Sequence, residues 1–214
     1  MAFNIASVLG PGRVAVLLSE VQRGVVGDLT GHFKGLADIA AEVGVLRNGS
    51  RLADAARVRG APVVHCLAIG DPAQFGHNTN IPLLAGLARR AQAAGLVYNP
   101  QADTPCPEVW REGDVIASRL HGMGPMADTA LDQRLRNAGI TTVIVAGVSL
   151  NVAVTNLTLD CANRGYQVIV AKDAVAGIPR EYGEAVLTNS LAMVATLASV
   201  DDIIAAWTAT ETAP

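Results

Sequence analysis

The sequence predicts an α/β protein whose mainly parallel sheet is covered by helices on both faces. Short runs of β-branched and small apolar residues alternate along the chain with longer segments of helical periodicity. The stretch 141–160, TTVIVAGVSLNVAVTNLTLD, is typical of a buried strand, a sharp turn and a helix in direct succession. In an open α/β sheet, ligands bind at the carboxyl ends of the strands. We therefore expect the functional site at Ser149–Ala153.

Composition and charge narrow the class of protein. The 214 residues suit one domain, 1–214, with a core over about residues 13–207. A net charge of −3 provides no basic surface for nucleic acid or for an anionic membrane. No stretch approaches the roughly 18–20 apolar residues of a membrane span, and residues 1–13 lack the features of a signal peptide. We therefore expect a cytoplasmic protein.

The cysteines and the apolar content add two expectations. Cys66, Cys106 and Cys161 are an odd number at no metal-like spacing, which argues against a disulfide framework and a structural zinc. Half of the residues are hydrophobic, which leaves less polar surface than usual. We therefore expect a homo-oligomer, a dimer or a tetramer.

In the amino-terminal part, the apolar run RVAVLL at 13–18 predicts a buried strand. Two helices are expected next, at 34–43 and 46–59, and the second has apolar residues at helical spacing with arginines on its other face. The segment GAP at 60–62 ends this helix. The apolar run 63–67 then predicts the second strand.

The middle of the chain alternates loops with short elements. Residues 81–94 predict a helix, with 68–80 as the loop before it. Its apolar positions recur at helical spacing: Leu83, Leu84, Leu87 and Ala91. Three prolines within 99–113 predict a loop, and DVIAS at 114–118 predicts a short third strand. A helix over 129–138 follows and ends at Gly139.

The stretch 141–160 supplies the fourth strand and its helix. The remaining elements are expected as a strand at 166–171, a loop at 172–178, a helix at 181–193, an edge strand at 194–199 and a helix at 200–207.

Motifs for nucleotide binding are missing from the sequence. No GxGxxG or GxxxxGK[ST] stands between a predicted strand and a helix. Residues 146–150, AGVSL, do not have the G-x-S-x-G spacing of a serine hydrolase elbow. The sequence therefore predicts neither nucleotide binding nor a serine hydrolase.

Glu20 lies at the end of an otherwise apolar strand. A carboxylate at that place projects into the crevice, and partial burial would raise its pKa and suit it to acid or base catalysis. An ordinary surface carboxylate at a strand–loop junction is the equally weighted alternative.

Ser118, Arg119 and His121 lie at the end of the third predicted strand, on the same edge of the sheet as Glu20. A hydroxyl, a cation and an imidazole near a carboxylate would form a plausible site. The alternative is that they are loop residues hydrogen-bonded to the backbone.

His65 and Cys66 are neighbours within a strand, so their side chains face opposite sides and do not form a catalytic dyad. At least one of them is expected to be a core residue. Cys161 recurs at helical spacing with Ala153 and Leu157 and is predicted to be a small core residue.

Several segments together resemble the isochorismatase-like hydrolase superfamily, which includes nicotinamidases, carbamoylsarcosine-type amidases and isochorismatases. The most specific is LDQRLRNAGITTVIVAGVSLNVAVTNLTLDCANRGYQVIVAKDAVAG; RVAVLLSEVQRGVVGD, GAPVVHC and GDVIASR are the others. The resemblance extends from about residue 13 to 207. It implies a three-layer α/β/α sandwich with a six-stranded, mainly parallel sheet in a protein that is usually oligomeric.

Hydrolases of this family use an Asp, a Lys and a nucleophilic Cys, and the matching positions here differ. Glu20, in Glu20-Val21-Gln22, stands for the Asp; Ser118, with Arg119 next to it, stands for the Lys; Ala153 stands for the Cys. A methyl group cannot form a covalent intermediate, so the family's covalent route is closed. Cys161 lies eight residues further along the helix, about 12 Å away at ~1.5 Å per residue, and cannot replace it.

The resemblance has further implications for the turn and for metals. The family often has a non-proline cis peptide at the turn, here Val148–Ser149. The backbone N–H groups of Leu150–Ala153 are expected to form an anion-binding or oxyanion pocket, with Ser149, Leu150 and Asn151 as substrate-binding residues. The Asp and two His of the nicotinamidase metal site are not recognisable around His65 or His77, so we predict no metal and no other cofactor.

Two hypotheses for function remain open. The first is a hydrolase of a small molecule without a Cys nucleophile, with Glu20 as an acid on a vinyl-ether or amide-type substrate and Arg119 or His121 orienting an anionic group. The alternative is a catalytically degenerate family member that binds a small molecule or acts as an oligomeric scaffold. A less favoured third possibility has Ser118 or Ser149 in place of the thiol.

Overall fold

The computed structural model describes residues 5–9, 13–71, 73, 75 and 78–209. Within these residues, six strands form one parallel sheet in the order β3-β2-β1-β4-β5-β6. The strands are β1 (Arg13–Ser19), β2 (Val63–Ala68), β3 (Val115–Arg119), β4 (Ile140–Val148), β5 (Gln167–Ala176) and β6 (Thr196–Ala198). The predicted six-stranded sheet is thereby confirmed.

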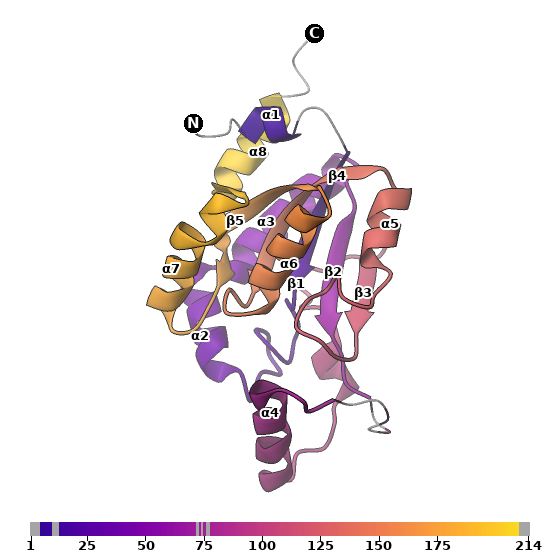
Figure 1. Cartoon of the computed structure of the whole chain (residues 1–214), viewed down its shortest axis with the longest axis vertical. Helices are drawn as coiled ribbons and strands as arrows, with labels where there is room; N and C mark the ends of the chain where they lie inside the picture. Colours follow the sequence, from indigo (N-terminus) through magenta and orange to yellow (C-terminus); the bar gives the residue numbers. More distant parts are fainter. Residues whose placement is uncertain (1–4, 10–12, 72, 74, 76–77, 210–214) are drawn as a thin grey trace.

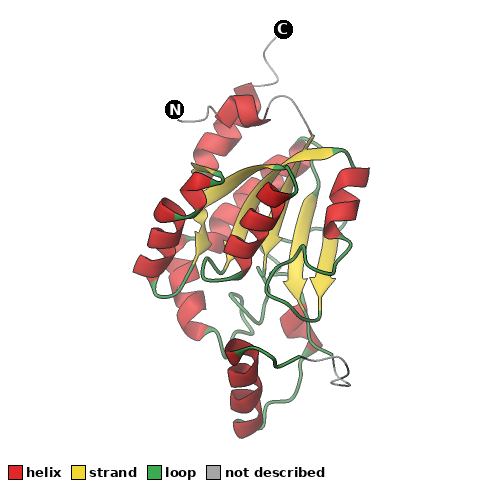
Figure 2. Ribbon diagram, viewed as in Figure 1, coloured by secondary structure: helices red, strands yellow, loops and turns green. Residues whose placement is uncertain are grey.

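Helices cover both faces of this sheet, as Figure 2 shows. One face packs against α1 (Ile5–Leu9), α2 (Lys34–Val43), α3 (Val45–Val58) and α8 (Val200–Ala209). The other face packs against α5 (Leu131–Asn137), α6 (Ala153–Asn163) and α7 (Arg180–Asn189). Alternate residues of β1 contribute to the two cores, Val14, Val16 and Leu18 to the first and Ala15 and Leu17 to the second. The three-layer α/β/α sandwich is therefore confirmed.

The remaining helix, α4 (Pro82–Ala93), lies apart from the sandwich (Figure 1). None of its residues is buried, so the apolar positions predicted at 81–94 do not pack into either core. Two 3-10 turns, η1 (Pro100–Asp103) and η2 (Leu191–Met193), complete the described elements. None of the helices in the described part of the chain is both long and apolar enough to cross a bilayer.

Two element ends differ most from the sequence-based expectation. The segment predicted as a loop at 172–178 is strand as far as Ala176, because the apolar residues after Asp173 resume pairing with β4 beyond an irregularity in register. The helix predicted over 181–193 ends at Asn189, and η2 follows it.

The ends of β1 and β4 approach each other closely. Gly147 has φ +107°, and a Cβ there would lie 2.1 Å from the carbonyl oxygen of Ser19. The Ser19 hydroxyl also donates a 3.0 Å hydrogen bond to the carbonyl oxygen of Val148. The cis peptide expected from the family resemblance is present at Val148–Ser149. This junction places the turn after β4 beside the residue that follows β1, which is Glu20.

Candidate active site

Glu20 directly follows β1 in a left-handed backbone conformation, with φ +50°. Its N–H donates to the carbonyl oxygen of Cys66 at the end of β2 over 2.9 Å, which fixes the backbone there. Its side chain is 18% exposed and forms an ion pair with Arg119. The alternative of an ordinary surface carboxylate therefore does not describe Glu20.

Burial raises the pKa of the Glu20 carboxyl, and the Arg119 guanidinium opposes that rise by its charge and its hydrogen bond. The net direction is upward. A carboxyl of this kind exchanges a proton at higher pH than a solvated Glu does, which suits it to acid catalysis.

Arg119, the last residue of β3, supplies the cation of this pair. Its side chain is only 6% exposed, and its Nε donates to the carbonyl oxygen of Gly122 over 3.2 Å. Its Nη1 is buried and has no hydrogen-bond partner among the described residues. Arg119 therefore holds Glu20 with one nitrogen and has a second, unpaired nitrogen.

The structure brings Arg119, and not Ser118, to Glu20. Strand β2 lies between β1 and β3, so a β3 side chain must reach across two strand spacings, roughly 10 Å in all, to meet Glu20. A serine is too short for that distance. Ser118 is also exposed and alternates with the buried Arg119 along the pleat, so it points to the opposite face. His121 is exposed in the loop after β3.

Several backbone N–H groups in and just after the turn that follows β4 already donate hydrogen bonds to backbone carbonyl oxygens. The Leu150 N–H donates to Ala176, and the N–H groups of Val152 and Val154 both donate to the Ser149 carbonyl oxygen. Two of the N–H groups in the expected Leu150–Ala153 oxyanion pocket are thus already engaged, because the backbone closes a tight turn before α6. These two N–H groups are therefore not free to donate to a ligand.

Two of the predicted substrate-binding residues have structural roles. Leu150 is buried in the core beneath α6 and α7. The Asn151 amide donates to the Ile178 carbonyl oxygen over 2.6 Å and accepts from the Ile178 N–H over 2.8 Å. Asn151 thus clamps the segment after β5 to the turn, and its side-chain nitrogen and oxygen are both occupied.

Ala153 is the first residue of α6 and is only 3% exposed. No other thiol is activated in its place. Cys66 lies within electrostatic reach of Glu20 and Arg119, but burial raises the pKa of its thiol to about 12. Burial also raises the pKa of Cys161. Burial therefore disfavours the thiolate form of both cysteines.

Two residues near this site were not identified from the sequence. Gln22 is buried and binds the Ala68 carbonyl oxygen, the Ala68 N–H and the Asp103 carbonyl oxygen, so it ties the loop after β1 to the end of β2. Asn156 lies one helical turn after Ala153, and its Oδ1 is buried without a partner in the described residues. The sequence did contain a signal for Asn156. It lies three residues after Ala153, and residues three apart lie on the same face of a helix.

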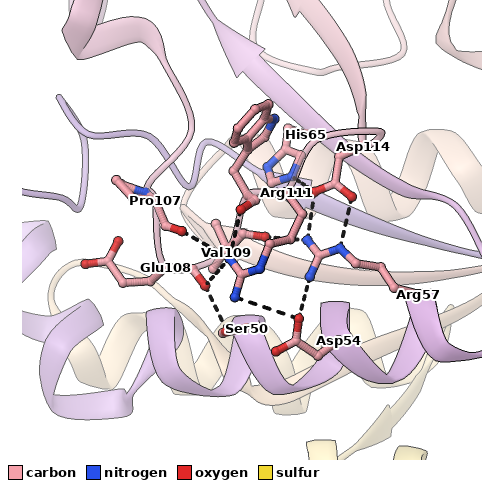
Figure 3. A network of polar contacts seen from close by, with 10 residues as sticks. Ser50, Asp54, Arg57, His65, Pro107, Glu108, Val109, Arg111 and Asp114 are labelled. Carbon is pink, nitrogen blue, oxygen red and sulfur yellow. Dashed lines mark hydrogen bonds and ion pairs between the residues drawn. The ribbon is translucent and has the colours of Figure 1, made fainter.

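A separate polar network surrounds Asp114 (Figure 3). His65 Nε2 lies 2.9 Å from Asp114 Oδ2, and Arg57 binds both Asp114 oxygens at 3.0 and 2.7 Å. Burial lowers the pKa of His65, so the ring is neutral and its Nε2–H is the donor to the carboxylate. The described residues contain no group of three His, Cys, Asp or Glu that could hold a metal ion, and His77 lies outside them.

A pocket of about 280 Å³ lies between α2, the end of β5 and α7. Leu150 reaches it from the turn, but Glu20, Arg119 and Ala153 do not line it. Its charges are mixed, and Arg180 in its wall pairs with Glu184 at 2.9 Å. This pocket is distinct from the Glu20–Arg119 pair.

Comparison with known proteins gives one family. A model of the isochorismatase domain matches residues 14–202. The secreted isochorismatase effector Isc1 of Verticillium dahliae is 30% identical over 128 residues, which are 60% of this chain and 57% of that protein. The uncharacterized isochorismatase family protein YecD of Escherichia coli O157:H7 is 26% identical over 81 residues, 38% and 43% of the two chains. The chain thus spans about half the length of these curated relatives.

The fold also resembles solved structures. A cysteine hydrolase from Pseudomonas syringae pv. phaseolicola superposes with a TM-score of 0.73 at 21% identity. The match covers 98% of this chain and 96% of that one. At this identity the likeness concerns the fold.

Proposed function

Because this chain belongs to the isochorismatase family, we propose that it is a hydrolase that cleaves a small anionic molecule without a cysteine nucleophile. Glu20 is the general acid and Arg119 binds the anionic group. The observation that carries the proposal is a buried carboxyl with a raised pKa that forms an ion pair with a buried guanidinium. Ala153, at the position that the resemblance matches to the thiol, offers only a methyl.

The ion pair itself explains how Glu20 becomes an acid. A substrate carboxylate that binds Arg119 competes with Glu20 for the guanidinium. Once Glu20 loses that partner, only burial acts on it, and burial favours the protonated form. Substrate binding therefore supplies the proton donor at the site where it is needed.

A vinyl ether is the substrate type that this chemistry fits best. Glu20 gives its proton to the enol-ether carbon, which forms an oxocarbenium ion. Water attacks that ion and returns a proton to the Glu20 carboxylate, and the resulting hemiketal breaks into a carbonyl compound and an alcohol. No covalent enzyme intermediate is needed, so Ala153 is compatible with every step. An amide-type substrate remains the second choice, because its usual route in the family requires a thiol.

Glu20→Gln tests the assignment directly. Glutamine keeps the size of the side chain but has no acidic proton, so kcat/KM should fall by about 100-fold or more. The measurement is product formation by chromatography over a panel of vinyl ethers, amides and ureides. Glu181→Gln, at an exposed position of α7, is the control. Unchanged turnover in Glu20→Gln would refute the role of Glu20.

The pH dependence has a definite sign. The acid form of Glu20 is the active one, and burial moves its pKa above 4.5. Activity should therefore be full below that raised pKa and should fall as the pH rises through it. A pH–rate profile of kcat/KM that instead rises with pH over this range would mean that Glu20 acts as a base.

A second function has its own support. Ala153 has no nucleophile and is nearly fully buried, and Glu20 and Arg119 already neutralise each other. A protein with these features would bind a small anion without turning it over. Saturable binding of a carboxylate together with no product from any member of the panel would favour this function.

A further inference from the structure

Helix α4 has an apolar stripe that its own sandwich does not bury. Leu83, Leu87 and Arg90 are four and then three residues apart, so they lie along one face of the helix. Leu83 is 43% exposed, Leu87 is half-buried and Arg90 is exposed. Helix α4 lies apart from the sandwich (Figure 1), and none of its residues is buried. Covering this stripe with a second surface would remove apolar area from water, which favours association.

The charge around this stripe is positive. Between residues 78 and 102, the only charged side chains are those of Arg89 and Arg90, and both are exposed. Successive residues are about 100° apart around a helix, so the two arginines point in different directions. Arg90 lies beside Leu83, two turns further along the helix, whereas Arg89 lies away from the stripe. The α4 face therefore combines leucines with one cation.

The pocket of about 280 Å³ between α2 and α7 has the complementary character. Its larger apolar lining residues are Ile39, Val43, Leu150, Val175 and Leu187. Its charged lining residues carry a net charge of −1, three carboxylates against two cations: Glu42, Asp173, Glu184, Lys172 and Arg180. Its volume is at the lower end of the roughly 300–1,000 Å³ of small-molecule sites. A pocket of this size suits a few side chains of a docking helix.

Two carboxylates of this pocket share one guanidinium. Arg180 Nη1 lies 3.6 Å from Glu42 Oε2, and Arg180 Nε donates to Glu184 Oε1 over 2.9 Å. The side chains of Glu42 and Glu184 are 63% and 61% exposed, so a second cation can reach them from outside. An incoming arginine would balance the charge that Arg180 leaves uncompensated.

We propose that the α4 face of one copy of this chain docks in the α2–α7 pocket of a second copy. Leu83 and Leu87 lie against its apolar lining, and Arg90 pairs with Glu42 and Glu184. The two surfaces are separate on each chain, so a two-fold arrangement makes the same contact twice and closes the assembly as a dimer. Neither surface includes Glu20 or Arg119, so the contact is independent of the proposed hydrolysis.

Sedimentation equilibrium tests the α4 side of this contact. Wild type should dimerise, and Arg90→Glu should weaken the dimer at least tenfold, because like charges then face each other across the interface. Arg89→Glu is the matched control. It makes the same change of charge one residue away, on a different face of α4, and should leave the dissociation constant within about twofold.

A charge exchange tests the pocket side. Glu42→Lys with Glu184→Lys should also weaken the dimer at least tenfold, and Glu112→Lys, exposed in the segment before β3, should not. An equal mixture of Arg90→Glu with the double lysine variant should dimerise again. In the mixed pair, one contact has its charges exchanged and the other is that of wild type.

Thermal unfolding should show that each variant is folded, since all of the substituted side chains are exposed. A monomeric wild type, a dimer that survives Arg90→Glu, or a mixture that stays monomeric would overturn the proposal. Hexylamine, an apolar group with a cation, probes the pocket by calorimetric titration. Its binding to a monomeric wild type would identify a small-molecule pocket instead. Glu20→Gln should dimerise as wild type does, so failure of the hydrolase and failure of the dimer are separable.

Discussion

At the residue scale, the proposed chemistry depends on three side chains at the carboxyl ends of the strands. Glu20 keeps the negative charge of the Asp to which the resemblance matches it. The position matched to the Lys is Ser118, and its neighbour Arg119 supplies the cation that pairs with Glu20. At the position that the resemblance matches to the Cys, this chain has Ala153, whose side chain is a methyl. Under the proposed function, this site has a proton donor and an anion binder and works without a nucleophile.

The junction on which these side chains depend is set by Gly147. Gly147→Ala would place a methyl 2.1 Å from backbone, at φ +107°, and should lower the free energy of unfolding by about 3 kcal/mol or more. Urea denaturation provides the measurement. Gly165→Ala is the matched control, since Gly165 has φ +85° and open space around its Cβ, and it should cost about 1–2 kcal/mol. Equal losses in the two variants would show that the contact with Ser19 is unimportant.

At the scale of elements, the Asp114 network joins α3, β2 and the segment that leads into β3 (Figure 3). Burial alone would raise the pKa of Asp114, but the hydrogen bonds from Arg57, His65 and the Arg111 N–H outweigh it and lower the pKa. These contacts fix the edge of the sheet from which Arg119 extends. The network therefore holds the start of β3 in place, four residues or more before Arg119.

Asp114→Ala should cost about 3–5 kcal/mol of stability, because Arg57 and His65 lose their shared acceptor in a buried setting. Asp54→Ala also removes an oxygen from Arg57, but Asp54 is exposed, so it should cost less than about 1 kcal/mol. Chemical denaturation of both variants compares the two losses. A loss below 1 kcal/mol for Asp114→Ala would mean that the network contributes little.

At the scale of the whole molecule, α4 and the chain after it leave apolar side chains at the surface. Leu83 is 43% exposed, Leu96 is 55% exposed and Val97 is 88% exposed. Side chains of this kind in one region of a monomer are a recurrent feature of association surfaces. If the protein forms the homo-oligomer that the composition leads us to expect, we propose that the copies meet at this surface.

Light scattering should accordingly give a mass of two or four chains for the wild-type protein. The double variant Leu83→Asp and Val97→Asp should shift the population to single chains, because buried carboxylates without partners oppose association. Val58→Asp, at an equally exposed position at the end of α3, should leave the mass unchanged. A monomeric wild-type protein at micromolar concentration would contradict this prediction.

Local sequence patterns determined most of the fold. Continuous apolar runs and helical spacing are properties of neighbouring residues, so the strands, α2, α3 and α6 were predictable from them. The resemblance added the three layers and the six strands. The missing thiol at Ala153 and the carboxylate at Glu20 were also determined by the sequence, since each depends on the identity of one residue.

Only the tertiary structure decided which of these residues meet. Arg119 rather than Ser118 pairs with Glu20, because β2 separates β1 from β3 and only a long side chain on the correct face spans that distance. Asn151 and Leu150 became structural because their partners, Ile178 and the core beneath α6 and α7, come from distant parts of the chain. Asn156 faces Gly124 for the same reason. Contacts between distant segments depend on the order of the strands in the sheet and on the conformation of the loops. Local sequence patterns determine neither of these.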